Sequence, residues 1–157
     1  MKPEIRDAFW QALARSPIVM LRLAGAGERT EHALANPMTA QIDSNAAGCV
    51  WFFMSRDSAL AAGGPAQADF SATGHDVFAV LEGELVEEVD PAVFDRFFTE
   101  EVAAWFVGDK ASDEALLMRF DIANAEVWMK DLWVSGLLRC LTGQAQQKGD
   151  HDSGPIS

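Results

Sequence analysis

Residues 55–58 (SRDS) are the part of the chain whose side chains could bind an anion. They follow the apolar run 50–54 and combine the hydroxyl groups of Ser55 and Ser58 with the positive charge of Arg56. A phosphate is stabilised where hydroxyls and unpaired backbone N–H groups meet at the start of a helix. An ordinary helix N-cap uses the same residue types, since a Ser side chain there accepts a backbone hydrogen bond. The sequence leaves both interpretations open.

A flat heteroaromatic ligand is the second kind of chemistry that the sequence allows. Thr39 and Gln41 fall on one face of a predicted strand, about 7 Å apart. Small polar groups at this spacing suit either the polar edge of such a ligand or plain exposure to solvent. Trp105 and Trp128 could stack on the ring, although Trp in a helix or strand also packs in cores and interfaces.

Familiar catalytic and metal-binding motifs are not found in the sequence. His32, His75 and His151 are scattered, without the HExxH spacing of a zinc site, and there is no GxGxxG, P-loop or GxSxG sequence. Cys49 and Cys140 are too few for a disulfide framework or a zinc site. We therefore predict no metal, and no residue stands out as a catalytic acid, base or nucleophile.

The formal net charge of −12 limits the partners of the chain. Nucleic acid and anionic membrane surfaces both attract Lys and Arg, so neither is expected to bind this protein. No apolar run reaches the roughly 18 residues that a membrane span needs. The N-terminal residues (MKPE) lack the apolar region of a signal peptide. The sequence therefore predicts a cytoplasmic location.

Hydrophobic periodicity predicts the elements that must position these side chains. The expected helices cover residues 3–15, 91 to about 106, and 132–141, with one helical turn at 59–62. The expected strands are 18–23, 38–42, 50–54, 66–73, 76–88, 116–121 and 125–129. Strands that follow one another without regular helical crossovers indicate an α+β fold with an antiparallel barrel of about six strands. We predict one domain over residues 1–142 and a disordered tail over 143–157, which is too polar to pack.

Two predicted strands carry further expectations. The strand 50–54 is apolar on both faces, so it should be covered on both sides, and we predict a stable homodimer that buries part of it. Gly83 lies in the middle of the strand 76–88, which often marks a β-bulge or a close backbone approach. The glutamates of that strand are expected at a solvated outer edge: Glu82, Glu84, Glu87 and Glu88.

The segment 37–41 (PMTAQ), followed after a turn by 51–58 (WFFMSRDS), resembles the general stress protein branch of the pyridoxamine 5'-phosphate oxidase-like, FMN-binding split-barrel family. A weaker likeness extends from Phe9 to about Trp128. The resemblance implies a six-stranded split β-barrel of Greek-key type with flanking helices, and a homodimer with two FMN molecules at its interface. It also implies flavin-dependent oxidoreductase activity, which the residues themselves do not show.

Carried over by position, the resemblance assigns ten residues to the cofactor. Along the isoalloxazine and its polar edge it implies Pro37, Met38, Thr39 and Gln41. At the ribityl and phosphate end it implies Phe53, Met54, Ser55 and Ser58. Trp105 and Trp128 match aromatic positions that approach the flavin from the partner subunit.

The chain departs from the family at two positions near the phosphate. The family usually has Arg before Pro-Met, where this chain has Asn36, and Lys after the SRDS-like turn, where this chain has Ala59 and Leu60. A charge-assisted hydrogen bond to phosphate contributes about 1.5–3 kcal/mol, so FMN binding should be weaker without these cations. The alternative is a non-enzymatic dimeric barrel that binds flavin weakly, or that carries or senses another planar ligand.

Overall fold

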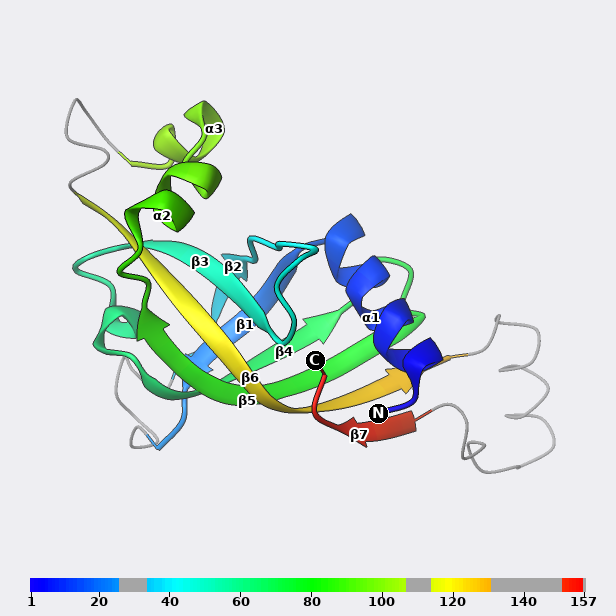
Figure 1. Ribbon diagram of the computed structural model, residues 1–157. Coiled ribbons are helices and arrows are strands. Elements are labelled where there is room, and N and C mark those ends of the chain that lie inside the picture. Colours follow the sequence, from blue (N-terminus) through cyan, green and yellow to red (C-terminus); the bar gives the residue numbers. More distant parts are fainter. Residues whose placement is uncertain (26–33, 107–113, 131–150, 157) are drawn as a thin grey trace, which may run out of the picture.

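The computed structural model describes residues 1–25, 34–106, 114–130 and 151–156 of the chain. Helices and strands alternate irregularly along these residues (Figure 1). The helical elements are α1 (Pro3–Arg15), η2 (Ala59–Ala62), α2 (Pro91–Phe97) and α3 (Glu100–Ala103). The strands are β1 (Ile18–Leu23), β2 (Asn36–Thr39), β3 (Cys49–Ser55), β4 (Gly64–Ser71), β5 (Val77–Glu87), β6 (Ala115–Met129) and β7 (His151–Gly154).

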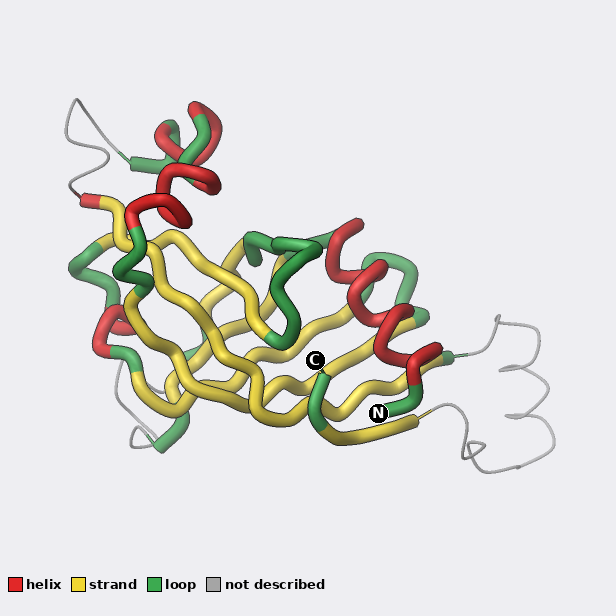
Figure 2. Tube along the Cα trace, viewed as in Figure 1, coloured by secondary structure: helices red, strands yellow, loops and turns green. Residues whose placement is uncertain are grey.

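The strands form one curved antiparallel sheet that does not close fully (Figure 2). Its order is β2-β1-β4-β5-β6-β3, with β7 paired to β6. The two ends of this order are joined by one isolated bridge, in which the backbones of Gln41 and Trp51 exchange hydrogen bonds of 2.7 and 3.0 Å. The predicted α+β split barrel is therefore confirmed, but the sheet has seven strands instead of six.

α1 forms over the predicted residues and packs against the sheet. Pro3 fits its first turn, where the missing N–H has no intrahelical partner in any case. The helix ends at Arg15 because Ser16 precedes Pro17, and a residue before proline is pushed out of the helical region. Phe9 lies on its apolar stripe and is completely buried.

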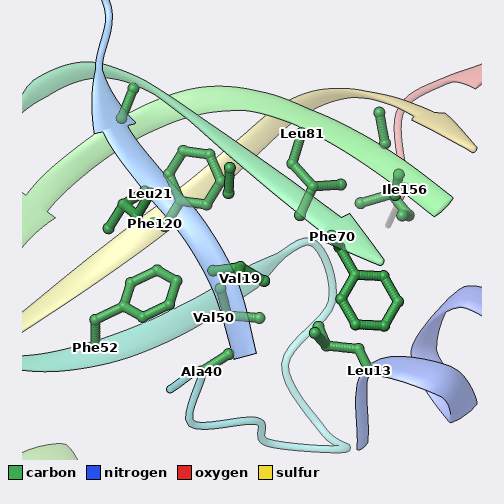
Figure 3. Packing of buried hydrophobic residues seen from close by; sticks show 14 of the residues in the cluster. Leu13, Val19, Leu21, Ala40, Val50, Phe52, Phe70, Leu81, Phe120 and Ile156 are labelled. Carbon is green, nitrogen blue, oxygen red and sulfur yellow. The ribbon is translucent and has the colours of Figure 1, made fainter. Parts of the chain in front are cut away.

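The main core lies between α1 and the inner face of the sheet. Figure 3 shows Leu13 of α1 close to Phe70 of β4, with Phe52 and Phe120 further along the same interior. The ring of Phe9 meets the ring of Phe70 edge to face, with centroids 5.9 Å apart. Helix and sheet therefore share one continuous apolar interior.

β3 is buried on both faces, as the sequence predicts. Its side chains alternate between the main core, which takes Val50, Phe52 and Met54, and a second cluster, which takes Trp51 and Phe53. The second cluster lies under α2 and α3 of the same chain. The prediction that a second subunit buries this face is therefore wrong, because α2 and α3 cover it. The burial of β3 is no evidence for or against a homodimer.

Residues 91–106 form two short helices instead of the single helix predicted. Asp90 caps α2 by accepting a 2.9 Å hydrogen bond from the Ala92 N–H, but α2 ends at Phe97. Thr99 then starts α3, because its hydroxyl accepts a 3.3 Å hydrogen bond from the Val102 N–H. A side-chain cap within a continuous apolar stripe thus divides the helix. In the part of the chain that the structure describes, no helix is long and apolar enough to cross a membrane.

β6 is one continuous strand of 15 residues, so the prediction of two strands joined across 122–124 is wrong. Its register with β5 shifts between Glu82 and Gly83, and Ala123 is the extra residue of a β-bulge. A Cβ atom on Gly83 would overlap the carbonyl oxygen of Asp121 and lie 3.0 Å from the Ile122 Cα. The bulge and the close backbone approach predicted at Gly83 are both confirmed.

The end of the chain is part of the fold. β7 pairs with residues 125–128 of β6, along the same edge on which β3 pairs with residues 115–121. Ile156 is completely buried in the main core, and its carbonyl accepts a 3.3 Å hydrogen bond from the Trp10 indole. The Lys2 N–H donates to the Asp152 carboxylate at 2.6 Å, so both ends of the chain lie beside β7 (Figure 1).

The prediction of a disordered tail is therefore wrong for residues 151–156. A polar composition disfavours a local core, but it does not reveal pairing with a strand more than twenty residues earlier. This segment supplies the seventh strand that the sequence did not predict. The predicted helix over 132–141 and the remainder of the predicted tail, 143–150 and 157, lie outside the described residues.

Candidate functional site

A pocket of about 370 Å³ lies where β2, the end of β3, η2 and the turn after α3 meet. Its apolar lining residues are Pro37, Met38, Phe53, Met54, Leu60, Trp105 and Phe106. Its polar lining residues are Asn36, Ser55 and Ser58. Phe53 and Leu60 are buried, whereas Trp105 is 53% exposed. A largely apolar pocket with an exposed aromatic side chain suits a flat aromatic ligand.

The second cluster positions the aromatic side of this pocket. The Phe53 ring on β3 contacts the rings of Phe94 and Phe98, with centroid distances of 5.5 and 5.8 Å. The N–H groups of Trp105 and Phe106 donate hydrogen bonds of 3.0 and 3.1 Å to carbonyls of α3. Packing of α2 and α3 on β3 therefore determines where Trp105 and Phe106 lie.

The turn at residues 55–58 has the geometry of a cap. Ser58 caps η2, since its hydroxyl oxygen accepts a 3.2 Å hydrogen bond from the Leu60 N–H. The Ser55 hydroxyl oxygen accepts one of 3.3 Å from the Asp57 N–H. Each hydroxyl retains its own hydrogen for donation, and both serines line the pocket. Of the two interpretations left open by the sequence, the structure shows the N-cap.

Seven of the ten residues that the sequence assigns to a ligand line this pocket: Pro37, Met38, Phe53, Met54, Ser55, Ser58 and Trp105. Thr39 and Gln41 do not line it. Thr39 ends β2, where it pairs with Ile18, and Gln41 forms the backbone bridge to β3. Asn36 and Leu60, which replace the cations expected from the family, are both lining residues.

Trp128 lies on the outer face of the sheet. It lines a second hollow, of about 420 Å³, with residues of β1, β4 and β5, and this hollow shares no lining residue with the first pocket. Its indole stacks on the His151 ring with centroids 5.0 Å apart, and His151 Nε2 lies 2.9 Å from Glu126 Oε1. The structure thus does not bring Trp128 together with the other predicted ligand contacts of the same chain.

An ionic cluster beneath α2 is a feature that sequence reasoning missed. The side chain of Glu88 is 7% exposed, and its carboxylate accepts a 2.9 Å hydrogen bond from the Trp51 indole. Arg119 lies 3.4 Å from the same carboxylate and holds Asp121 through two contacts of 2.8 and 3.2 Å. The prediction that Glu88 belongs to a solvated edge is wrong, since β5 is an inner strand and Glu88 follows its end.

The ionisation of this cluster indicates a structural role. Burial acts to raise the pKa of Glu88, but hydrogen bonds from the Trp51 indole and the Asp90 N–H, with the charge of Arg119, lower it overall. The hydrogen bond to Asp121 is the main cause that raises the pKa of Arg119. Burial, followed by the charge of Asp121, raises the pKa of the nearby Cys49 thiol, which makes it a poor nucleophile at neutral pH. Nor does any group of His, Cys, Asp and Glu within the described ranges suit a metal ion.

Known proteins resemble this chain along most of its length. The sequence pattern of the family described as pyridoxamine 5'-phosphate oxidase like matches residues 4–149. The general stress FMN/FAD binding protein of Xanthomonas citri is 39% identical, covers 83% of this chain and 92% of its own, and superposes with a TM-score of 0.73. A protein assigned to the general stress family in Xanthomonas campestris pv. campestris is 41% identical, with coverages of 84% and 92% and a TM-score of 0.72.

A more distant structure shows the same fold over nearly the whole chain. A protein assigned as general stress protein 26 in Jannaschia sp. CCS1 is 25% identical, covers 97% of this chain and 98% of its own, and has a TM-score of 0.76. No curated protein matches the chain. The sequence pattern and the solved structures therefore agree on the family and on the fold.

Proposed function

The chain belongs to the pyridoxamine 5'-phosphate oxidase-like family, and from this premise we propose that it binds FMN in the pocket between β2, β3 and the turn after α3. The observation that carries the proposal is the lining of that pocket. Seven residues from three separate segments, assigned from sequence alone, converge on one apolar hollow with an aromatic rim. A relative 39% identical to this chain is described as an FMN/FAD binding protein.

Different side chains of the pocket would contact different parts of the flavin. Phe53, Met38 and Trp105 would contact the flat, largely apolar ring system, and the Ser55 and Ser58 hydroxyls would donate to the ribityl end. Bound FMN supplies hydride and single-electron transfer, so the protein has only to hold and orient it. We assign no catalytic residue, because none of the described side chains lining the pocket is a titratable acid or base.

Two functions remain compatible with this site. A flavin-dependent oxidoreductase would oxidise a reduced nicotinamide cofactor in a steady turnover, with the two electrons passing through the flavin to an acceptor such as dioxygen. A flavin carrier or sensor would bind the flavin without turnover. Purified protein that is colourless and fails to quench the fluorescence of added FMN would contradict both. Turnover with NADH or NADPH would then separate the enzyme from the carrier.

Replacement of Trp105 by Ala is expected to weaken flavin binding by at least about fivefold, because stacking on a heteroaromatic ring contributes about 1–3 kcal/mol. The melting temperature should change little, since Trp105 is 53% exposed. Fluorescence titration with FMN measures the first effect and thermal unfolding the second. Val89→Ala is the matched control, since Val89 is 82% exposed and does not line the pocket. Equal FMN affinity in the Trp105 variant and the wild type would show that Trp105 does not contact the flavin.

The second part of the proposal is a homodimer that forms through the outer face of the sheet. Ile18 and Met20 of β1 are 55% and 41% exposed, which is unusual for large apolar side chains on a strand. They border the hollow that Phe78, Val80 and Trp128 also line. An apolar face of this kind typically marks a protein contact, and a specific interface buries more than about 1,000 Å² in total.

Met20→Asp is expected to convert the dimer to a monomer, because it replaces an apolar contact of that face with a second carboxylate beside Asp69, its cross-strand neighbour. Light scattering at micromolar concentration measures the change, and Val89→Asp is the matched control on an exposed position outside the face. A wild-type monomer would contradict the homodimer. A Met20→Asp variant that remains dimeric would assign the interface to another surface.

Trp128→Ala tests whether a partner subunit completes the flavin site. If the Trp128 of one protomer reaches the flavin of its partner, the substitution should weaken flavin binding and leave the melting point of the flavin-free protein nearly unchanged. The opposite result is a large loss of flavin-free stability with unchanged flavin affinity. That result would mean that Trp128 stabilises the fold, through packing and its stack on His151, and does not contact the flavin.

A further inference from the structure

The phosphate end of the proposed flavin site carries no charge complementary to a phosphate. None of the described residues that line the pocket is charged, and the positions expected to hold cations hold Asn36 and Leu60. Arg56 lies in the adjoining turn, but it is exposed and is not a lining residue. Asp57 follows it directly, so the turn has no net positive charge. Charge-assisted hydrogen bonds, the strongest contacts that a phosphate makes, are thus not provided by these side chains.

Backbone N–H groups do not replace the missing cations. An anion at a helix start is held by N–H groups that lack a partner in the protein. Along this turn the N–H groups of Asp57 and Leu60 donate to the Ser55 and Ser58 hydroxyls. Those of Arg56, Ser58 and Ala61 donate to backbone carbonyls at 3.0–3.2 Å. Five N–H groups of the turn therefore already have acceptors within the protein. A phosphate would have to displace those acceptors before it could bind the N–H groups.

The overall charge of the protein also disfavours the binding of a phosphate. The chain has a formal net charge of −12, and a phosphate monoester carries about −1.5 to −2 at neutral pH. Its field therefore opposes the approach of FMN and has no comparable effect on an uncharged ligand. The apolar wall and the serine hydroxyls, by contrast, make the same contacts with a phosphorylated and an unphosphorylated flavin.

We infer that the pocket recognises the ring and the ribityl chain of a flavin and not its phosphate, so that uncharged riboflavin binds about as tightly as FMN. This inference rests on the proposed flavin site and deepens it. It specifies the ligand as a neutral flavin, with phosphorylated forms held by the same contacts to the ring and the ribityl chain. We assign this specificity to the absence of a cation at Asn36 and at the Ala59–Leu60 pair.

Parallel fluorescence titrations of the full chain with riboflavin and with FMN test the inference. We expect the two dissociation constants to differ by less than tenfold. FMN binding at least tenfold tighter than riboflavin would overturn the inference and leave the flavin site standing. It would then show that a cation outside the described lining of the pocket, such as Arg56 of the adjoining turn, contacts the phosphate. Binding of neither ligand would overturn both the inference and the proposed function.

A double variant tests the residues themselves. Asn36→Arg combined with Ala59→Lys should tighten FMN binding by at least tenfold and leave riboflavin binding within a fewfold of the wild type; Ala59 is chosen because it is half-buried, whereas Leu60 belongs to the main core. Val89→Arg combined with Ser153→Lys is the matched control, since it adds the same two charges at exposed positions outside the pocket and should change neither affinity strongly. An unchanged FMN affinity in the Arg/Lys variant, with riboflavin still bound and the fold intact by circular dichroism, would mean that these positions do not face the phosphate.

Discussion

Ile156→Ala is expected to lower the free energy of unfolding by about 2–5 kcal/mol, the range for truncating a fully buried aliphatic side chain. Ile156 has no exposed surface and belongs to the main core. The loss combines the removed apolar contact with the cavity that remains beneath α1. Denaturant unfolding followed by circular dichroism measures it.

Ser153→Ala is the matched control, because Ser153 lies in β7 but its side chain is exposed. It should change the unfolding free energy by no more than about 0.5 kcal/mol. If Ile156→Ala were as mild as this control, the last residues would not be anchored in the core. A strong effect of Ile156→Ala alone would show that the buried end of the segment contributes far more to stability than the exposed Ser153 side chain of β7.

Gly83→Ala is the second substitution with a large expected effect, a loss of about 2–3 kcal/mol from overpacking. Replacing glycine by alanine usually restricts the unfolded chain and stabilises by about 0.4–1 kcal/mol. At Gly83 the steric effect prevails, because the added Cβ overlaps a backbone carbonyl and lies 2.9 Å from the Asp121 carbonyl carbon. Backbone atoms of an inner strand cannot move aside as a flexible side chain can.

Gly74→Ala provides the comparison for Gly83. A Cβ there meets the Asp76 side chain at 3.3 Å, and Gly74 is exposed in a turn. Asp76 can rotate away, so the change in unfolding free energy should stay within about 1 kcal/mol. Equal effects of the two substitutions would mean that the β5–β6 pairing relaxes around the bulge at no cost.

Local sequence patterns predicted the helices and strands whose boundaries are set by neighbouring residues. α1 is bounded by Pro3 and by the Ser16–Pro17 pair, and β1 by its aliphatic run, so both occur over the predicted residues. The division of 91–106 was missed because the Thr99 cap interrupts no apolar periodicity. β7 was missed because its stability comes from contacts with Trp10 and β6, which lie far away in the sequence.

The candidate site was predictable where a motif fixed several neighbours at once. The segment 53–58 and the Pro37–Met38 pair line one pocket because β2 and β3 approach each other at the opening of the barrel. Strand alternation also suggested Thr39 and Gln41 as ligand contacts. Neither residue lines the pocket of this chain, because β2 ends at Thr39 and Gln41 joins the two ends of the sheet. The Glu88–Arg119 cluster had no signal, since its members are 31 residues apart and separated by two helices.

The docking of residues 151–156 sets a limit on when this protein can fold during synthesis. The hydrogen bond from Trp10 to Ile156 spans 146 residues of sequence, and contacts between such distant residues slow folding. A ribosome releases the N-terminal residues of α1 long before it adds Ile156, so the nascent chain must wait with the β6 edge at 125–128 unpaired. An unpaired strand edge readily joins other chains. We therefore expect a chaperone that shields exposed strands to improve the yield of folded protein during translation.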